Sequence, residues 1–526
     1  MLGWNWHVDI VPETRFDDWV KWSRKFTRLP CILVYPERKA PSCWLPFWTG
    51  RASILLESGK AGRYTILVPK VELLLSGSES EGGIWDIRET DPQRLECVKG
   101  TPIEVIRYWL TKNQGPRLPT YPPCLGGLMG MFSYDLARTL EQLPDISDAD
   151  IPYPLYALAI VSELYVHDHK DQNLYSVVWH TEPPHDSLDS HDRTALRAAF
   201  DQCRARAQAN AGRWIAIENH DVPSSLNDNS VLAGTRPPAS GTLSLDRSAF
   251  EKAALRIQRY ISTGDTYQVN LSLRETRPLT APPESVYEEL RRINPSPYMG
   301  LFRLLDFTLV SGSPELLVRR HGPRLEARPI AGTRPRDKES GRDRALAEEL
   351  MAHPKERAEH LMLVDLIRND LGRVSRYGTV RVRDFMVRED YSHVHHIVSH
   401  IEGELAAHRD ALDVLAATFP GGTITGAPKV RTMEIIEELE PVRRGPYTGS
   451  LGWIGFSGDM ELNITIRTLV AENDRAHVQA GAGIVADSVP QKEFEESINK
   501  ARALWAAMDA AESRRGESNT TANHPH

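Results

Sequence analysis

Strand-forming runs recur along most of this chain and constrain its fold more than any other feature. Runs rich in β-branched and aromatic residues, such as RYTILV and LYALAIVSELYVHDH, fill residues 1 to about 180 between Pro and Gly clusters. The second half alternates runs such as TYQVNLSLR and HVQAGAGIVA with helical segments around 342–352, 355–370, 428–439 and 490–511. The pattern predicts large sheets accompanied by helices.

The length of the chain bears on its domain organisation. A chain of 526 residues exceeds one ordinary core, so we expect two or three domains or one large intertwined unit. The polar run VPSSLNDNSVLAGTRPPASGT, at 222–242, predicts a linker. We therefore divide the chain into an N-terminal region with the linker (1–235), a catalytic region (236–512) and a disordered polar tail (513–526).

Charge and cysteine content exclude several classes of protein. Lys and Arg total 63 against 71 Asp and Glu, a net charge of -8, and no long basic run suggests a nucleic-acid or membrane surface. No run approaches the roughly 18 apolar residues of a spanning helix, and the acidic N-terminus lacks a signal-peptide pattern, so we expect a cytoplasmic protein. The five cysteines form no C-x-x-C pair and support neither disulfides nor zinc.

Two acidic pairs are the first candidate for a functional site. Glu356 and Glu359, like Glu493 and Glu496, are three residues apart and share a helix face. Two such helices, if packed together, could present four carboxylates to one hard cation such as Mg²⁺. Each pair is equally compatible with a solvated helix face, and Lys500 with an ordinary i, i+4 pair to Glu496.

Glycine-rich segments are the second candidate. In FPGGTITGAPKVRTMEII, a glycine turn leads into a helix, whose N-terminus can bind an anion; a plain capped turn is the alternative. The segment is not a P-loop, because Ala427 follows Gly426 and no Lys-Ser/Thr pair comes after it. In GAGIVADS, Gly481 and Gly483 lie in a strand, where glycine permits close approach of a ligand.

Together these segments resemble the chorismate-utilising enzymes, which include the anthranilate, aminodeoxychorismate, isochorismate and salicylate synthases. The likeness covers residues 246–511 through RPIAGTRPR, RAEHLMLVDLIRNDLGRV, HVHHIVS, PGGTITGAPKVR and GAGIVADS, in the family's order and spacing. ILLESGKAGRYTI and PPCLGGLMGMFSYDLAR resemble the N-terminal half of the ammonia-using members. The resemblance implies an α+β fold of two large antiparallel sheets packed as a sandwich, with helices outside.

The resemblance also implies roles for individual residues. Glu359 and Glu496 would bind Mg²⁺, with Glu356 and Glu493 in support, and the ion would anchor the ring carboxylate of chorismate and withdraw charge. Because chorismate is a dianion, the acidic face attracts it only with the metal present. The other implied site residues are the catalytic His396, Glu315 as general acid and Thr333, and the substrate contacts Gln268, Gly426, Tyr447, Arg467, Gly481, Gly483 and Lys500.

Several details of the resemblance bear on which nucleophile and product to expect. Isochorismate-type members carry a lysine base where this chain has Gln268, so ammonia is a better nucleophile here than water. Gly422, Thr425, His395 and the QVNLS segment resemble aminodeoxychorismate synthases. Ala331 replaces a lysine that attacks C2 covalently in some of them, so we expect direct attack of ammonia at C2 with loss of the C4 hydroxyl. The expected product is 4-amino-4-deoxychorismate, for 4-aminobenzoate and folate synthesis; the alternative is anthranilate and pyruvate, for tryptophan synthesis.

Two expectations concern a partner and a second ligand. No cysteine lies in a G-x-C-x-G elbow, so a separate glutamine amidotransferase subunit is expected to supply ammonia within a heterodimer. Part of the N-terminal half resembles the tryptophan pocket of anthranilate synthases, although an ordinary strand and turn is equally compatible. The residues of this possible tryptophan pocket are Glu57, Ser58, Asn294, Pro295, Tyr298 and Met299.

Overall fold

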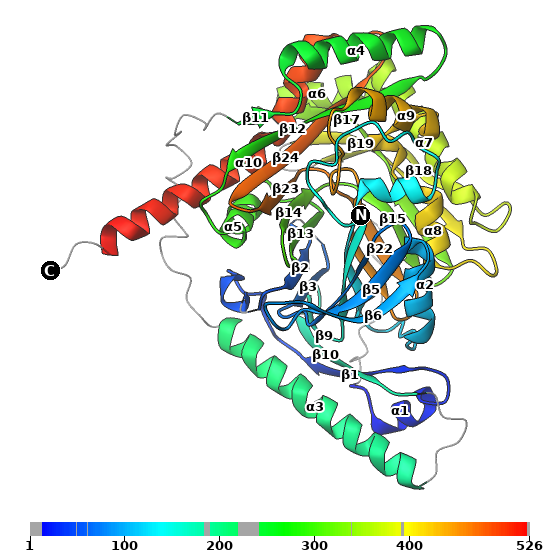
Figure 1. Cartoon of the computed structure of the whole chain (residues 1–526), viewed down its shortest axis with the longest axis vertical. Helices are drawn as coiled ribbons and strands as arrows, with labels where there is room; N and C mark the ends of the chain where they lie inside the picture. Colours follow the sequence, from blue (N-terminus) through cyan, green and yellow to red (C-terminus); the bar gives the residue numbers. More distant parts are fainter. Residues whose placement is uncertain are drawn as a thin grey trace.

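Two 12-stranded antiparallel sheets form the centre of the molecule, and helices lie outside them (Figure 1). This computed structural model confirms the α+β prediction of two large antiparallel sheets with outer helices. The structure describes residues 13–48, 50–59, 62–183, 190–218, 241–337, 339–390 and 394–522.

The first sheet joins strands from both halves of the chain. In spatial order its strands are β1 (Arg28–Tyr35), β10 (Asn173–Thr181), β9 (Glu163–Asp168), β3 (Tyr64–Val68), β2 (Ser53–Glu57), β13 (Tyr298–Arg303), β14 (Thr308–Ser313), β23 (Thr468–Glu472), β24 (Arg475–Ile484), β12 (Gln268–Pro278) and β11 (Thr242–Leu243), with β20 (Gly426–Ala427) paired to β12. The predicted boundary near residue 235 therefore does not separate two sheets.

The second sheet mixes the two halves in the same way. Its strands are β17 (Ile330–Pro335), β19 (Val394–Glu404), β16 (Arg324–Arg328), β15 (Leu316–His321), β22 (Met460–Ile464), β21 (Ser450–Gly455), β7 (Gly127–Phe132), β8 (Tyr156–Val161), β4 (Leu73–Gly77), β5 (Glu81–Asp86) and β6 (Gln93–Lys99), with β18 (Arg381–Asp390) paired to β19. Because β21 pairs with β7 along its whole length, the N-terminal and C-terminal halves share one sheet here as well.

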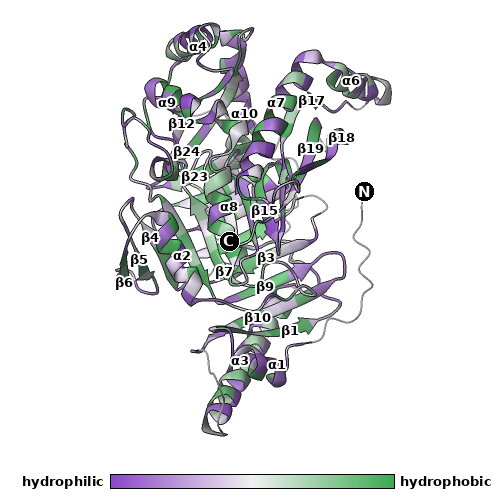
Figure 2. Ribbon diagram, turned by 90° about the vertical axis from the view of Figure 1, so that its right-hand side faces the viewer, coloured by the Kyte–Doolittle hydropathy of each residue, from purple (hydrophilic) through white to green (hydrophobic). Residues whose placement is uncertain are grey.

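One hydrophobic core lies between the two sheets. Ile54 and Phe302 of the first sheet and Leu128 and Leu462 of the second belong to the same buried cluster. Figure 2 shows hydrophobic residues concentrated in the central strands and hydrophilic residues along outer helices such as α4 (Arg247–Ser262) and α6 (Ser340–Ala352). Burial of apolar side chains from both sheets is the main stabilising contribution to such a sandwich.

The remaining helices cover the sheets and their connections. They are α1 (Phe16–Trp22), α2 (Pro102–Lys112), α3 (Ser190–Glu218), α5 (Pro283–Ile293), α7 (Pro354–Gly372), α8 (Ala411–Thr418), α9 (Lys429–Leu439) and α10 (Pro490–Ala522). Helix α3 packs on β1 and β10, and α10 packs on β24 and α5. In the described part of the chain, no helix has both the length and the apolar composition needed to cross a bilayer.

The C-terminal segment corrects one expectation. We predicted a disordered tail from 513 onward, but α10 continues through Ala522, so the prediction is wrong up to that residue. Tertiary contacts explain the difference: the Glu512 carboxylate accepts hydrogen bonds from the backbone and hydroxyl of Thr280, and Arg514 forms a 2.9 Å ion pair with Glu289. The last residues, 523–526, lie outside the described part, as does the predicted linker apart from 241–242.

Truncation tests whether these contacts stabilise the protein. We expect a chain that ends at Ala511 to unfold about 2 °C below the full chain, because losing two polar contacts costs about 2 kcal/mol and a chain of this length shifts by roughly 1 °C per kcal/mol. A chain ending at Ala522 is the control and should match the full chain. Differential scanning calorimetry makes the measurement; equal midpoints for all three chains would contradict this account.

Candidate active site

The predicted site residues converge where α7 and α10 meet strands of both sheets, in the upper half of Figure 1. Helix α7 packs on β17 and β19, α10 packs on β24, and β24 pairs with β12. The backbone of Gly426, in β20, pairs with Val269 of β12. Segments more than 200 residues apart in sequence, such as those with Gln268 and Lys500, therefore contribute to one site.

The acidic faces of α7 and α10 lie close together. Burial raises the pKa of Glu359 on α7, and the charges of Lys355 and Lys500 lower it. Burial likewise raises the pKa of Glu493 on α10, and the same two lysines lower it. Because Lys355 belongs to α7 and Lys500 to α10, each helix places a cation near the carboxylates of the other. The two acidic pairs therefore belong to one electrostatic environment.

The acidic residues have the chemistry of a magnesium site without forming a closed metal cage. Within the described residues, no three His, Cys, Asp or Glu side chains are placed to hold a metal ion. Three of the four carboxylates have separate partners: Glu359 accepts from Gln268 Nε2 (2.7 Å), Glu356 pairs with Arg334 (3.1 Å) and Glu496 pairs with Lys500 (2.8 Å). Mg²⁺ typically takes only one or two protein carboxylates and completes its shell with water and ligand oxygens. The carboxylates therefore fit magnesium by ligand type, and its binding here stays a prediction.

Two cations belong to the site, the partly exposed Lys500 and the desolvated Arg467. Lys500 Nζ donates to the carbonyl oxygen of Gly481 (3.0 Å) as well as pairing with Glu496. Burial lowers the pKa of Arg467, and the charge of Glu315 raises it. In the described part of the chain, Arg467 forms no ion pair with a carboxylate at hydrogen-bonding distance. A guanidinium that is largely desolvated and has no carboxylate partner suits a carboxylate of a bound ligand.

Glu315 is a buried carboxyl group with the properties of a general acid. It follows β14, and its backbone oxygen accepts a hydrogen bond from the Ile464 amide (3.0 Å). Burial raises the Glu315 pKa to about 7, against smaller lowering effects from the Thr423 hydroxyl, Arg467 and Lys500. Near neutral pH the group is therefore protonated in a large fraction of molecules and can donate a proton.

His396 is a buried neutral imidazole in β19. Burial lowers its pKa to about 4, with Arg467 adding to the effect. Its Nδ1 donates to the Gly332 carbonyl oxygen (3.1 Å), so the neutral ring has its unprotonated nitrogen at Nε2. Thr333 lies opposite His396 in the β17–β19 register. Gly332 has φ +66, and a Cβ there would come within 3.0 Å of Glu356, so glycine lets β17 approach the acidic pair.

The glycine loop and Tyr447 are held by a residue that sequence reasoning missed. Gly426 has φ +130, and a Cβ there would lie 2.0 Å from the Gln268 carbonyl oxygen. Arg444 donates to the carbonyl oxygens of Ile424 (3.0 Å) and Asn270 (2.7 Å), and its guanidinium lies 5.5 Å from the ring centre of Tyr447. The sequence could not predict this role, because a buried arginine that binds the backbone of two distant segments has no characteristic spacing from them.

An ion pair that the sequence does not reveal joins two of the motifs described above. Asp370, near the end of α7, and Lys429, at the start of α9, form a 2.7 Å ion pair with little exposure of either side chain. This contact fixes the helix that carries Glu356 and Glu359 relative to the loop that carries Gly426. Asp370 lies in RAEHLMLVDLIRNDLGRV and Lys429 in PGGTITGAPKVR. Their pairing across the chain can be seen only in the structure.

The residues of the possible tryptophan pocket also come together. Glu57 of β2 lies opposite Met299 of β13, and the Gly59 amide donates to the Ser296 carbonyl oxygen (2.8 Å). Glu57 is buried and already accepts a hydrogen bond from Tyr287 (2.6 Å). These contacts bring the Glu57–Ser58 turn beside the 294–299 segment, and binding of tryptophan there stays a prediction.

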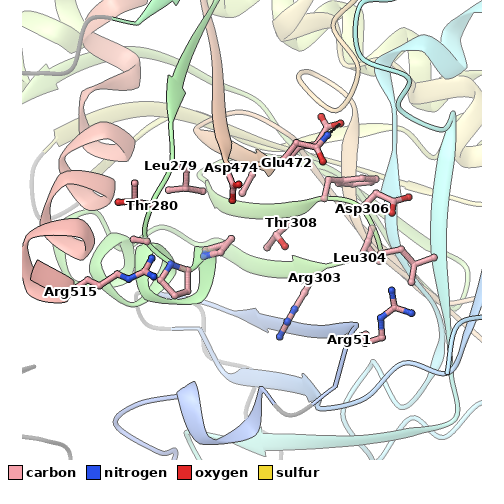
Figure 3. Close-up of a pocket in the computed structure, with 17 residues that line it drawn as sticks. Arg51, Leu279, Thr280, Arg303, Leu304, Asp306, Thr308, Glu472, Asp474 and Arg515 are labelled. Atoms are coloured by element: carbon pink, nitrogen blue, oxygen red, sulfur yellow. Dashed lines mark hydrogen bonds between the residues drawn. The ribbon is translucent and has the colours of Figure 1, made fainter. Parts of the chain in front are cut away.

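Neither of two cavities coincides with the predicted acidic site. A cavity of about 410 Å³ lies between β14, β23 and the start of α5, with Arg51, Arg303 and Arg515 around it (Figure 3). None of the predicted site residues lines it. A second cavity, of about 20 Å³, is lined by Tyr447 and Arg444, among other residues.

A neutral histidine, a protonatable carboxyl and two nearby cations fit an enzyme site for an anionic substrate. A family model described as a chorismate binding enzyme matches residues 52–506. The chain belongs to the chorismate binding enzyme family, and it acts on chorismate. These findings confirm the resemblance inferred from the sequence.

Relatives of two kinds are similar to this chain. It is 41% identical over 461 residues to aminodeoxychorismate synthase component 1 of Bacillus subtilis (strain 168), covering 87% of this chain and 92% of that protein. It is 46% identical over 396 residues to anthranilate synthase component 1 of Thermus thermophilus, covering 75% and 80%. The solved structure of anthranilate synthase component I from Streptococcus pneumoniae TIGR4 matches with a TM-score of 0.68 at 31% identity, covering 85% and 92%.

The role of Glu315 can be tested through pH. As pH rises through about 7, Glu315 loses the proton that a general acid must donate, so kcat/KM for chorismate should fall. Glu315→Gln should lower kcat by about a hundredfold or more and remove this alkaline limb. The profiles are measured at a constant concentration of un-ionised ammonia. An alkaline limb that survives in the Gln variant would show that another group supplies the proton.

Proposed function

We propose that this chain is component 1 of an aminodeoxychorismate synthase, which converts chorismate and ammonia to 4-amino-4-deoxychorismate for 4-aminobenzoate and folate synthesis. One observation favours ammonia over water as the attacking nucleophile. Gln268 hydrogen-bonds Glu359 (2.7 Å) from the position where isochorismate-type relatives have a basic lysine. An amide cannot remove a proton from water, whereas un-ionised ammonia needs no activation before it attacks.

The residues that resemble aminodeoxychorismate synthases rather than anthranilate synthases lie around the site. The backbone N–H of Asn270, in the QVNLS segment, donates a hydrogen bond to the Thr425 carbonyl oxygen (2.9 Å). Thr425 is fully buried. His395 is buried and hydrogen-bonds Asp390 (2.7 Å) next to His396. Residues whose types resemble aminodeoxychorismate synthases therefore lie in direct contact with the site segments.

Each side chain has a specific part in the proposed reaction. Mg²⁺ held by Glu359 and Glu496 would neutralise the ring carboxylate and withdraw electrons from the ring. Arg467 and Lys500 bind the substrate carboxylates through charge-assisted hydrogen bonds. Glu315 donates its proton to the C4 oxygen as the C4–O bond breaks, so that water leaves. His396 stays neutral and contributes no charge beside the ring.

The position of the new C–N bond follows from Ala331. This residue lies in β17 opposite Ile397, so no lysine amine is available to attack C2 from that point. Ammonia therefore forms the first bond, at C2, and the C4 hydroxyl leaves. A second ammonia must then attack C4 and expel the first from C2, which gives the 4-amino product with net consumption of one ammonia and release of one water.

Anthranilate synthase component 1 is the second candidate, and Ala331 is also the observation that favours it. If the reaction stops after the first substitution, nitrogen remains at C2, and loss of the enolpyruvyl group as pyruvate gives anthranilate. The similarity to the Thermus thermophilus protein and the adjacent positions of Glu57 and Met299 are compatible with this outcome.

A separate glutamine amidotransferase subunit is the proposed source of ammonia. None of the five cysteines lies in a nucleophile elbow, and burial raises the pKa of the Cys31, Cys43, Cys124 and Cys203 thiols, which suppresses the reactive thiolate.

Product identification tests the proposal. We expect the purified chain to consume chorismate with Mg²⁺ and ammonium salts and to release 4-amino-4-deoxychorismate, with its enolpyruvyl group retained. Glutamine should support turnover only after the amidotransferase subunit is added. Mass spectrometry and a pyruvate assay follow the products. Anthranilate with stoichiometric pyruvate would establish the second candidate instead, and glutamine-dependent turnover by the single chain would refute the partner.

A further inference from the structure

Two amide oxygens on β12 are buried without hydrogen-bond partners. Gln268 is 6% exposed, and its Nε2 is occupied by Glu359, which leaves Oε1 as an acceptor. Neither Gln268 Oε1 nor Asn270 Oδ1 has a partner in the described part of the protein. A buried unpaired acceptor costs the folded state free energy, so two of them two residues apart on one strand indicate a ligand that donates hydrogen bonds.

The two amides lie on the same face of the strand. Residues two apart in a strand point the same way, and Val269, between them, packs with Leu271 on the opposite side. A Cβ on Gly483 would lie 2.3 Å from Gln268 Nε2, and one on Gly481 would lie 2.6 Å from Asn270 Oδ1. The two glycines of β24 therefore leave the space that both amides occupy. The hydrogen bond from Gln268 to Glu359 places this face in the active site.

The chemistry of the two oxygens selects for a small neutral donor. Ammonia has three N–H donors and one lone pair, so binding to acceptor oxygens leaves the lone pair available for attack. Water would need a base to become an equally good nucleophile, and amide oxygens do not supply one. Neutral acceptors also avoid trapping ammonium, which a carboxylate at this position would stabilise.

We propose that the amide oxygens of Gln268 and Asn270 form the subsite that holds the attacking ammonia. This inference rests on the proposed use of ammonia and adds the residues that bind it. Gln268 is the contact beside Glu359, and Asn270 is the second contact, two residues further along the strand. Asn270 touches neither the acidic pairs nor the substrate-binding cations in the described contacts, so its substitution separates ammonia binding from chorismate binding.

The test compares KM for ammonia in Asn270 variants at saturating chorismate. Asn270→Val suits a strand and removes the acceptor, so KM for ammonia should rise about tenfold, as expected for one lost hydrogen bond, while KM for chorismate stays within twofold. Asn270→Thr also suits a strand but keeps a neutral oxygen acceptor, so it should raise KM for ammonia less than Asn270→Val does. Asn270→Ala provides a second deletion of the acceptor if the Val variant folds poorly, as judged by its thermal midpoint.

A surface amide provides the matched control. Gln491 is exposed and donates only to Glu251 in the described contacts (3.2 Å), so Gln491→Leu should leave both KM values unchanged. If the unmodified chain uses ammonia but the Val and Ala variants keep its KM for ammonia, the subsite is wrong and the proposed function stands. If the unmodified chain does not use ammonia at all, the proposed function fails and the subsite fails with it.

Discussion

The proximity of the acidic faces of α7 and α10 is the constraint on which the site depends. Carboxylates brought together from two helices repel each other, and burial of Glu359 and Glu493 raises the pKa of both groups. Above their ordinary pKa values, keeping these groups ionised costs the folded state free energy. Lys355 and Lys500 offset part of that cost, and a divalent cation would offset more. The same arrangement that is unfavourable for the empty site is therefore favourable for a metal and a dianion bound together.

The rest of the fold holds α7 and α10 in fixed positions relative to each other. Helix α10 lies on β24, and β24 pairs with β12, whose Gln268 reaches Glu359 of α7. The ion pair between Asp370 and Lys429 fixes the far end of α7 to the glycine loop. Because β12 comes early in the second half of the chain and α10 at its end, the site forms only when the sheet is complete.

The sequence predicted the elements better than their contacts. Periodicity placed helices near 355–370 and 428–439, and the structure has them at Pro354–Gly372 and Lys429–Leu439. The i, i+3 spacing of the acidic pairs was visible in the sequence, since spacing along a helix is local information. The partners of those carboxylates were not visible, because Arg334 and Gln268 reach them through tertiary packing. The extension of α10 to Ala522 was missed for the same reason, since Thr280 and Glu289 contact it from another element.

Chorismate binding with and without magnesium tests the central claim most directly. Isothermal titration calorimetry is performed on the unmodified chain and on the Glu359→Gln and Glu496→Gln variants, which keep the side-chain shape and remove one charge. The account predicts that Mg²⁺ strengthens chorismate binding to the unmodified chain at least about tenfold and that each variant loses this gain. Without Mg²⁺ the variants should bind chorismate no more weakly than the unmodified chain, because one repulsive charge is gone. Equal affinity with and without the metal, or an undiminished metal effect in both variants, would contradict the account.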